Sequence, residues 1–162
     1  LTPPCILSAR IVATTTAVMQ LVERGVIRLT DPVATWVPGF EKFGKGSITI
    51  RHLLTHVSGL RPDVDLGDPW KGYEAAIALA QDEVPQSAPG DRFVYSDINF
   101  FLLGEIVARA SRTPLQQFVR ERVFGPLGMS ETRPFFIERI SSPAMRIVVS
   151  GVVCTSVPSG HS

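Results

Sequence analysis

Apolar positions recur at helical spacing along most of the chain and predict a mainly helical protein. Residues 9–24 show the pattern well, because Ile11 and Val18 fall on one face of a helix. Ser8 stands at the start of this segment, and Gly25 is well placed to end it. The threonines within the segment are poor helix formers, so we expect burial to support this helix.

Other segments predict shorter elements. We expect helices over residues 73–83, 98–110 and about 113–124, the last opening with a Thr-Pro-Leu-Gln capping box. Before them we expect a helix that starts at Pro32, a brief strand over residues 47–50 and a helical turn over residues 51–55.

The pattern changes from about residue 135. The tail is rich in Ser, Val and Pro, and it has few charges after Arg146. Its apolar residues do not alternate with polar ones, since Ile147, Val148 and Val149 are consecutive. A buried strand and a disordered end both fit this tail.

Composition narrows the class of protein. The 162 residues, 44% of them hydrophobic, suit one globular domain with its own core. The net charge is +1 and the arginines are spread along the chain, so nothing points to nucleic acid or an anionic membrane. No segment reaches the ~18 apolar residues that a membrane span needs.

Cysteine usage and the first residue leave the cellular compartment open. Cys5 and Cys154 are too few and too distant for a disulfide framework or a metal site, so we expect free thiols. We also expect no cofactor. The chain starts with Leu1 rather than Met, which predicts a processed, trimmed or partial product.

Two histidines four residues apart form the first candidate for chemistry. His52 and His56 fall on one helical face, a spacing that also occurs in zinc-binding helices. Those helices place Glu after the first His, where this chain has Leu53, and no third ligand stands out. Structural histidines at a helix end are therefore the favoured interpretation.

Ser8 and Tyr95 are two further candidates, and each has an ordinary structural explanation. A serine at a helix start gains from the exposed amides there, but the same position also suits an N-cap. Tyr95 precedes a long helix and is able to shuttle a proton or donate a hydrogen bond. On spacing alone, a boundary tyrosine with a buried ring is the favoured interpretation of Tyr95.

The order of four segments carries a resemblance to a known family. The segments are ATTTAVMQLVERGVIRLTDPVATWVPGF, ITIRHLLTHVSGL, PGDRFVYSDINFFLLGEIVARAS and TPLQQFVRERVFGPLGMSET. In this order they resemble the serine β-lactamase-related family, which groups class C-like β-lactamases, D-amino-acid peptidases, penicillin-binding-protein relatives and family VIII-type carboxylesterases. The resemblance covers residues 7–134, whereas residues 1–6 and 135–162 diverge from it.

The resemblance implies a fold and a reaction. The family fold is α+β, with a helical lobe and an antiparallel sheet lobe on either side of the active site. This chain would be a mainly α fragment of it, with the helical lobe present and most of the sheet lobe missing. The implied reaction is acyl transfer, in which a serine attacks a small-molecule ester, a peptide or a β-lactam carbonyl and water releases the acyl-enzyme.

Two of the family's three catalytic motifs map onto this chain. Its Tyr-x-Asn motif falls on Tyr95-Ser96-Asp97, where the carboxylate replaces an amide. Its Ser-x-x-Lys motif places the nucleophile on Ser8 and the lysine position on Ile11, which has no proton to exchange. Arg10 does not replace the lysine, because it lies off the face of Ser8 and stays protonated.

The third motif, Lys-Thr-Gly or His-x-Gly, is absent from the sequence. We therefore expect a truncated and inactive serine hydrolase, with a non-catalytic member that binds a ligand or partner as the alternative. The abrupt divergence at both ends suggests flanking sequence replaced by a frameshift, misjoined exons or an assembly error. An apolar face left where the sheet packs would favour self-association.

Overall fold

The computed structural model describes residues 5–62, 73–129, 133–134 and 152–153. Within these ranges the chain is almost entirely helical, and a single antiparallel ladder of two short strands joins Arg133 to Val153. In chain order the elements are α1 (Cys5–Glu23), α2 (Val33–Trp36), η1 (Lys42–Ser47), α3 (Ile50–Leu54), α4 (Tyr73–Asp82), α5 (Asp97–Ser111), α6 (Leu115–Val119), η2 (Arg120–Phe124), β1 (Arg133–Pro134) and β2 (Val152–Val153).

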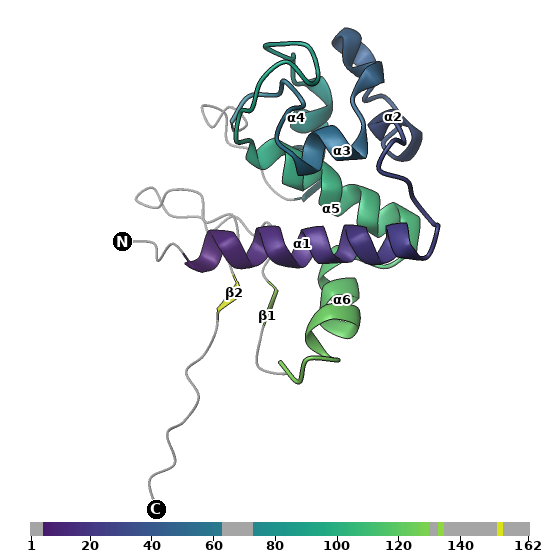
Figure 1. Cartoon of the computed structure of the whole chain (residues 1–162), viewed down its shortest axis with the longest axis vertical. Helices are drawn as coiled ribbons and strands as arrows, with labels where there is room; N and C mark the ends of the chain where they lie inside the picture. Colours follow the sequence, from purple (N-terminus) through teal and green to yellow (C-terminus); the bar gives the residue numbers. More distant parts are fainter. Residues whose placement is uncertain (1–4, 63–72, 130–132, 135–151, 154–162) are drawn as a thin grey trace, which may run out of the picture.

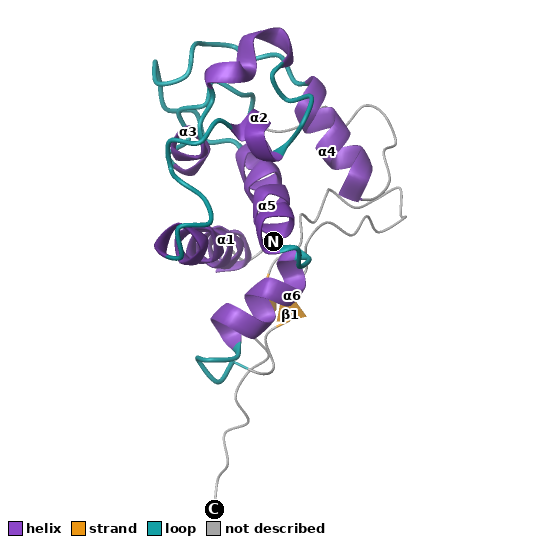
Figure 2. Cartoon of the chain, turned by 90° about the vertical axis from the view of Figure 1, so that its right-hand side faces the viewer, coloured by secondary structure: helices purple, strands orange, loops and turns teal. Residues whose placement is uncertain are grey.

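Helix α5 is the centre of the molecule. It packs against α1, α2, α3, α4 and α6, and every residue from 98 to 107 is buried. A helix that is apolar on all sides is one that other elements surround. Figures 1 and 2 show α2, α3 and α4 above α5, with α1 and α6 below it. The core therefore forms around α5, and the residues at its start are held by the whole fold.

The long helices follow the sequence pattern closely. Helix α1 begins at Cys5, four residues before the predicted start, and its last residue is Glu23; Gly25, with φ of +68°, terminates it as predicted. The amide of Val26 donates to the carbonyl of Leu21 (3.0 Å), and that of Gly25 donates to Val22 (2.9 Å). These two bonds form a Schellman motif, which satisfies carbonyls at the helix end. The predictions for α4 and α5 are confirmed to within one residue at each end.

The prediction of a strand over residues 47–50 is wrong. The segment forms one isolated bridge, between Pro32 and Thr49, and α3 starts at the next residue. Thr49 instead caps α3, because its Oγ1 accepts from the amide of His52 (3.4 Å) while His52 Nδ1 accepts from the amide of Thr49 (3.2 Å). This reciprocal capping box satisfies two helix-end donors and outweighs the β-branched composition that suggested a strand.

The capping box predicted at Thr113 is also wrong. Thr113 Oγ1 donates to the carbonyl of Ser111 (3.3 Å), and no side chain caps α6, which follows Pro114. The predicted helix over residues 113–124 forms as two elements, because its second half is the π-helix η2.

A buried lysine joins η1 to the end of α4. Lys45 is fully buried, and its Nζ donates to the carbonyls of Gln81 (2.6 Å) and Glu83 (2.5 Å). The same ammonium lies 5.0 Å from the ring centroids of Phe40 and Phe43. Burial lowers the pKa of Lys45, although the carboxylates of Asp82 and Glu83 partly oppose this shift. The carbonyls and rings replace the water that the ammonium loses.

The turn after α3 is packed against the segment that leads into α5. The amide of Gln86 donates to the carbonyl of Gly59 (2.8 Å), and that of Gly90 donates to Val57 (2.8 Å). Gly59 has φ of +82°, and a Cβ atom added to it would lie 2.1 Å from the carbonyl oxygen of Ser87. Only glycine allows this close approach of two backbones.

His56 connects this turn to the start of α5. Its backbone has φ of +57°, its carbonyl accepts from the amide of Val94 (2.8 Å), and its Nδ1 accepts from the amide of Ser96 (3.1 Å). The amide nitrogen of Asn99 lies 3.3 Å from the same Nδ1, and Ser58 Oγ donates to Asn99 Oδ1 (2.7 Å). Because Nδ1 accepts from a backbone amide, the ring is neutral and carries its proton on Nε2.

No helix among the described residues is long and apolar enough to cross a membrane. Some large apolar side chains are nevertheless exposed, including those of Val12 and Met19 on α1 and Leu127 after η2. The self-association expected from an exposed apolar face stays a prediction.

Replacing Gly59 by alanine should destabilise the fold by at least about 2 kcal/mol, since the new Cβ overlaps the Ser87 carbonyl and the backbone is left-handed. Gly90→Ala is the matched control. Gly90 also has a positive φ, +92°, but has open space around it, so its replacement should cost only about 1 kcal/mol. Urea titrations followed by circular dichroism measure both values, and equal losses would contradict the steric argument.

Acid should weaken the fold through His56. Burial lowers the pKa of His56 in the folded state, with a partial opposing effect from Asp97. The unfolded chain therefore binds a proton at higher pH than the folded one does. The contribution of His56 is fully present above the unfolded pKa of about 6.5 and is lost as pH falls below it.

The measurement is the free energy of unfolding between pH 7.5 and 5, where one proton gives a slope of at most about 1.4 kcal/mol per pH unit. His56→Asn should remove this slope, because Asn keeps an acceptor oxygen and tolerates a left-handed backbone but does not titrate. His52→Asn, which alters the other imidazole of the motif, should retain it. An unchanged slope in His56→Asn would assign the acid sensitivity to another group.

Candidate active site

The backbone on both sides of Tyr95 is fixed by hydrogen bonds to three residues that follow α3, namely His56, Arg61 and Pro62. Ser96 donates its amide to His56 Nδ1 and its buried Oγ to the carbonyl of Arg61 (2.5 Å). The amide of Asp97, the first residue of α5, donates to the carbonyl of Pro62 (2.7 Å). With Val94 bonded to the carbonyl of His56 on the other side, the position of Tyr95 is set by its neighbours.

The side chains of Tyr95 and Asp97 are brought together. Tyr95 is 36% exposed, and its hydroxyl donates to Asp97 Oδ1 at 3.1 Å. The ring centroids of Tyr95 and His56 are 4.7 Å apart at a 30° tilt, and Phe100 packs on the same imidazole at 5.4 Å. Tyr95 thus rests on His56 and presents a partly exposed hydroxyl beside a carboxylate. A carboxylate only accepts hydrogen bonds, so Asp97 orients the phenol proton toward itself.

Ser8 and Ile11 both lie within α1. The helix starts at Cys5, so Ser8 is its fourth residue rather than its N-cap, and its amide is among the four that the helix leaves unbonded. Ile11 follows at plus three, on the same helical face, and it is half-buried against the core. In Figure 1, α1 and α5 both start on the left of the molecule.

Both lysines among the described residues form contacts at the end of α4. Lys45 is enclosed by carbonyls and rings, and Lys42 pairs with Asp82 at 3.2 Å. Both therefore lie at the end of α4. Lys71, the third lysine of the chain, falls outside the described residues.

The sequence did not predict the buried layer beneath Tyr95. The hydrogen bonds of His56, Ser58 and Asn99 fix this layer, and only the HLLTHVSGL segment hinted at its importance. The signal for Asn99 is its place four residues after Tyr95 in a long helix, which alone is too common to be informative.

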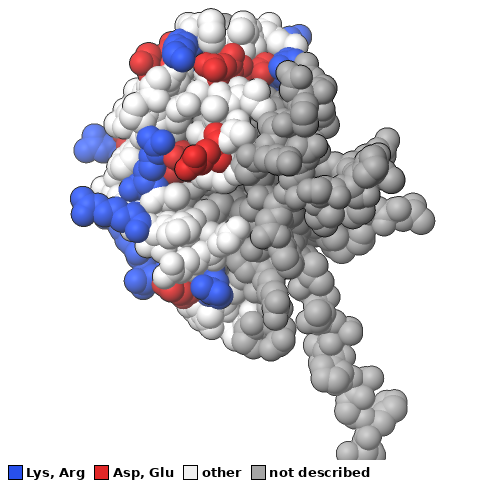
Figure 3. Space-filling model, turned by 180° about the vertical axis from the view of Figure 1, so that it is seen from behind, with Lys and Arg blue, Asp and Glu red and all other residues white. Residues whose placement is uncertain are grey.

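Charge is mixed on the described surface. Figure 3 shows Lys and Arg side chains next to Asp and Glu side chains on one face of the molecule. Arg61 and Glu83 form a two-point ion pair (2.5 and 2.8 Å), and Glu105 accepts from Arg109 (2.5 Å) and from the hydroxyl of Tyr73 (2.5 Å). In the part of the chain that the structure describes, no three His, Cys, Asp or Glu residues are grouped to hold a metal ion.

Known proteins resemble both the sequence and the fold. Penicillin-binding protein 4* of Bacillus subtilis is 34% identical over 132 residues, which are 75% of this chain and 28% of that protein. The chain thus spans less than a third of the length of this relative.

Two solved structures share the arrangement of helices. The octameric penicillin-binding protein homologue of Pyrococcus abyssi matches 79% of this chain and 32% of its own, with a TM-score of 0.69 and 31% identity. A beta-lactamase/D-alanine carboxypeptidase of Pseudomonas syringae matches 80% of this chain and 36% of its own, with a TM-score of 0.68 and 25% identity. The described helices therefore have the helical arrangement of a β-lactamase fold.

The model of the Beta-lactamase family matches residues 2–134, which include α1, the turn after α3, Tyr95 and the helices α5, α6 and η2. By this match over most of its length, the chain belongs to the beta-lactamase family.

Proposed function

We propose that this chain carries a serine-hydrolase site for acyl transfer, with Ser8 at the nucleophile position and Tyr95 as the group that exchanges protons with the substrate. The substrates would be small molecules with an ester, amide or β-lactam carbonyl. Support comes from the names of similar proteins, which include penicillin-binding proteins and D-alanine carboxypeptidases, and from the paired side chains of Tyr95 and Asp97.

The observation that carries the proposal is the combination of a tyrosine motif, in which Asp97 replaces the family's amide residue, with a base position that holds Ile11. Tyr95 is held by its neighbours and directed toward Asp97, whereas Ile11 stands one turn after Ser8 and packs on the core. A serine hydroxyl is a weak nucleophile until a base removes its proton. Ser8 would therefore react slowly or not at all, since removing one member of such a unit costs orders of magnitude in rate.

A second candidate function is binding without turnover. This function is favoured by the way in which His56 holds Tyr95, through a hydrogen bond to Ser96 and ring packing. Neither contact depends on a base at position 11. An exposed phenol with a neighbouring carboxylate presents hydrogen-bonding groups to a ligand that carries donors, such as a peptide amide.

Restoring a base should restore reactivity. Ile11→Lys places an amine on the face of Ser8, and its flexible stem can remain on the apolar surface where Ile11 now lies. We expect labelling of Ser8 by a fluorescent fluorophosphonate or penicillin to become at least tenfold faster than in the unaltered chain. In-gel fluorescence measures the rate, and peptide mass spectrometry locates the label.

Two variants control this experiment. Ile11→Met supplies a flexible side chain without an amine and should leave labelling unchanged, while Ser8→Ala in the Ile11→Lys chain should abolish it. Equal labelling of Ser8 in the unaltered chain and in Ile11→Lys would show that the serine needs no base at position 11. Labelling that survives Ser8→Ala would exclude Ser8 as the nucleophile.

If binding without turnover is the function, an unaltered chain that is not labelled should still melt at a higher temperature with millimolar D-alanyl-D-alanine. Tyr95→Phe should reduce this shift by at least half, because the phenol oxygen is lost while the ring stays on His56. Differential scanning fluorimetry measures both. No shift in the unaltered chain, or an equal shift in Tyr95→Phe, would argue against binding at Tyr95.

A further inference from the structure

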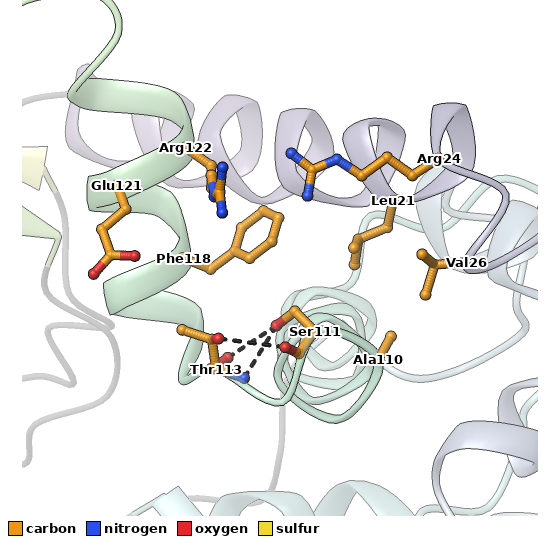
Figure 4. Close-up of a pocket in the computed structure, with 9 residues that line it drawn as sticks. All are labelled: Leu21, Arg24, Val26, Ala110, Ser111, Thr113, Phe118, Glu121 and Arg122. Atoms are coloured by element: carbon orange, nitrogen blue, oxygen red, sulfur yellow. Dashed lines mark hydrogen bonds between the residues drawn. The ribbon is translucent and has the colours of Figure 1, made fainter.

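A cavity of about 250 Å³ lies at the end of the molecule where α1 and α5 finish. Its walls come from the end of α1 and the residues that follow it, from the end of α5 with Thr113, and from α6 with η2. Figure 4 shows the lining residues, which are Leu21, Arg24, Val26, Ala110, Ser111, Thr113, Phe118, Glu121 and Arg122. Ser8 and Leu21 are 13 residues apart on α1, so about 20 Å of helix separates this cavity from the nucleophile position.

The cavity has an apolar floor and a cationic rim. Leu21 and Phe118 are only 2% and 4% exposed, so their side chains form a firm surface. In Figure 4 the guanidinium groups of Arg24 and Arg122 both point over the ring of Phe118. Among the described residues, neither guanidinium forms an ion pair with a carboxylate. Two positive charges therefore face one small cavity without a described acidic partner.

The other polar groups at the cavity do not compensate this charge. Glu121 points away from the remaining lining residues in Figure 4, and its carboxylate accepts from Gln117 Nε2 (2.9 Å). Ser111 Oγ donates to the carbonyl of Val107 (2.7 Å), and Thr113 Oγ1 donates to that of Ser111 (3.3 Å). The hydroxyls are thus engaged by nearby carbonyls, and the donors left for a ligand are the N–H groups of the two arginines.

Contacts between the helices fix the walls of the cavity relative to one another. Gln20 Nε2 donates to the carbonyl of Arg122 (2.9 Å) and so ties α1 to η2. Arg122 also belongs to a π-helix, a rare geometry that occurs often at functional sites. Outside the lining itself, Gly104 lets α6 approach α5, since a Cβ there would lie 2.8 Å from Leu115 Cδ2. The cavity is therefore a fixed feature of the packing between these helices.

We propose that this cavity binds a small organic monocarboxylate with an aromatic or apolar body. The planar guanidinium groups match the geometry of a carboxylate, and the floor of Leu21 and Phe118 matches an apolar body. The volume equals that of about eight water molecules, enough for one ring and its carboxylate. The proposal goes beyond the acyl-transfer function, because none of these residues belongs to the Ser8 and Tyr95 motifs.

The test compares an acid with its uncharged isostere. The full chain is titrated with 3-phenylpropionate and with 3-phenylpropanamide while ¹H–¹⁵N spectra are recorded. We expect saturable shifts of the Ser111 and Thr113 amides with the acid, and binding at least tenfold weaker with the amide. Raising NaCl from 20 to 300 mM should weaken binding of the acid. Equal binding of acid and amide, or no saturable shift with the acid, would overturn the proposal.

Arginine variants locate the anion. Arg24→Met and Arg122→Met should each weaken binding of the acid about tenfold or more, since each removes a charged donor but keeps an apolar stem. Arg120→Met is the matched control, because Arg120 is also exposed on η2 but does not line the cavity. If Arg120→Met weakened binding of the acid equally, the effect would be one of general surface charge, and this would overturn the proposal. The acid–amide comparison on the unaltered chain decides the question even if a variant unfolds.

Discussion

The hydrogen bond from the amide of Ser96 to His56 Nδ1 joins the turn after α3 to the start of α5, beside Tyr95. It requires a neutral imidazole, a left-handed backbone at His56 and a turn that passes close to Ser87, which Gly59 allows. The same imidazole supports the ring of Tyr95, so a change in its charge acts on the tyrosine directly. The HLLTHVSGL segment therefore has a definite structural role, because His56, Ser58 and Gly59 all take part in the connection between the turn after α3 and the start of α5.

The connection around His56 is required for folding, whereas a base beside Ser8 would be required only for reactivity. The bonds around Tyr95 are buried or partly buried, and their loss leaves unsatisfied donors and acceptors, so folding alone maintains them. A lysine beside Ser8 would serve reactivity, and folding does not require it. Ile11 packs on the core at that position, where a charged amine would lose hydration. Under the proposed assignment, the chain keeps the support of Tyr95 while a residue that favours stability stands at the base position.

The sequence predicted the parts of the fold that periodicity controls. The helix over residues 98–110 and the termination of α1 by Gly25 were predicted from the pattern, because a helical period repeated over several turns is a strong signal. The strand over residues 47–50 failed because the cap at Thr49 is a contact between side chain and backbone, which β-branched composition does not reveal. For the site, motif order placed Tyr95 and Asp97 together, but the role of His56 depends on a contact across 40 residues that periodicity does not encode.

The two ends of α1 differ in the charge they favour, and this bears on both sites. The start of a helix carries partial positive charge from free amides, which suits a serine oxygen that becomes negative during acyl transfer. The end carries partial negative charge, which favours cations such as Arg24. That attraction is spread over the last turn and leaves the N–H donors of Arg24 unpaired by any described carboxylate. The same helix therefore has the proposed nucleophile position near its start and a cationic cavity at its end.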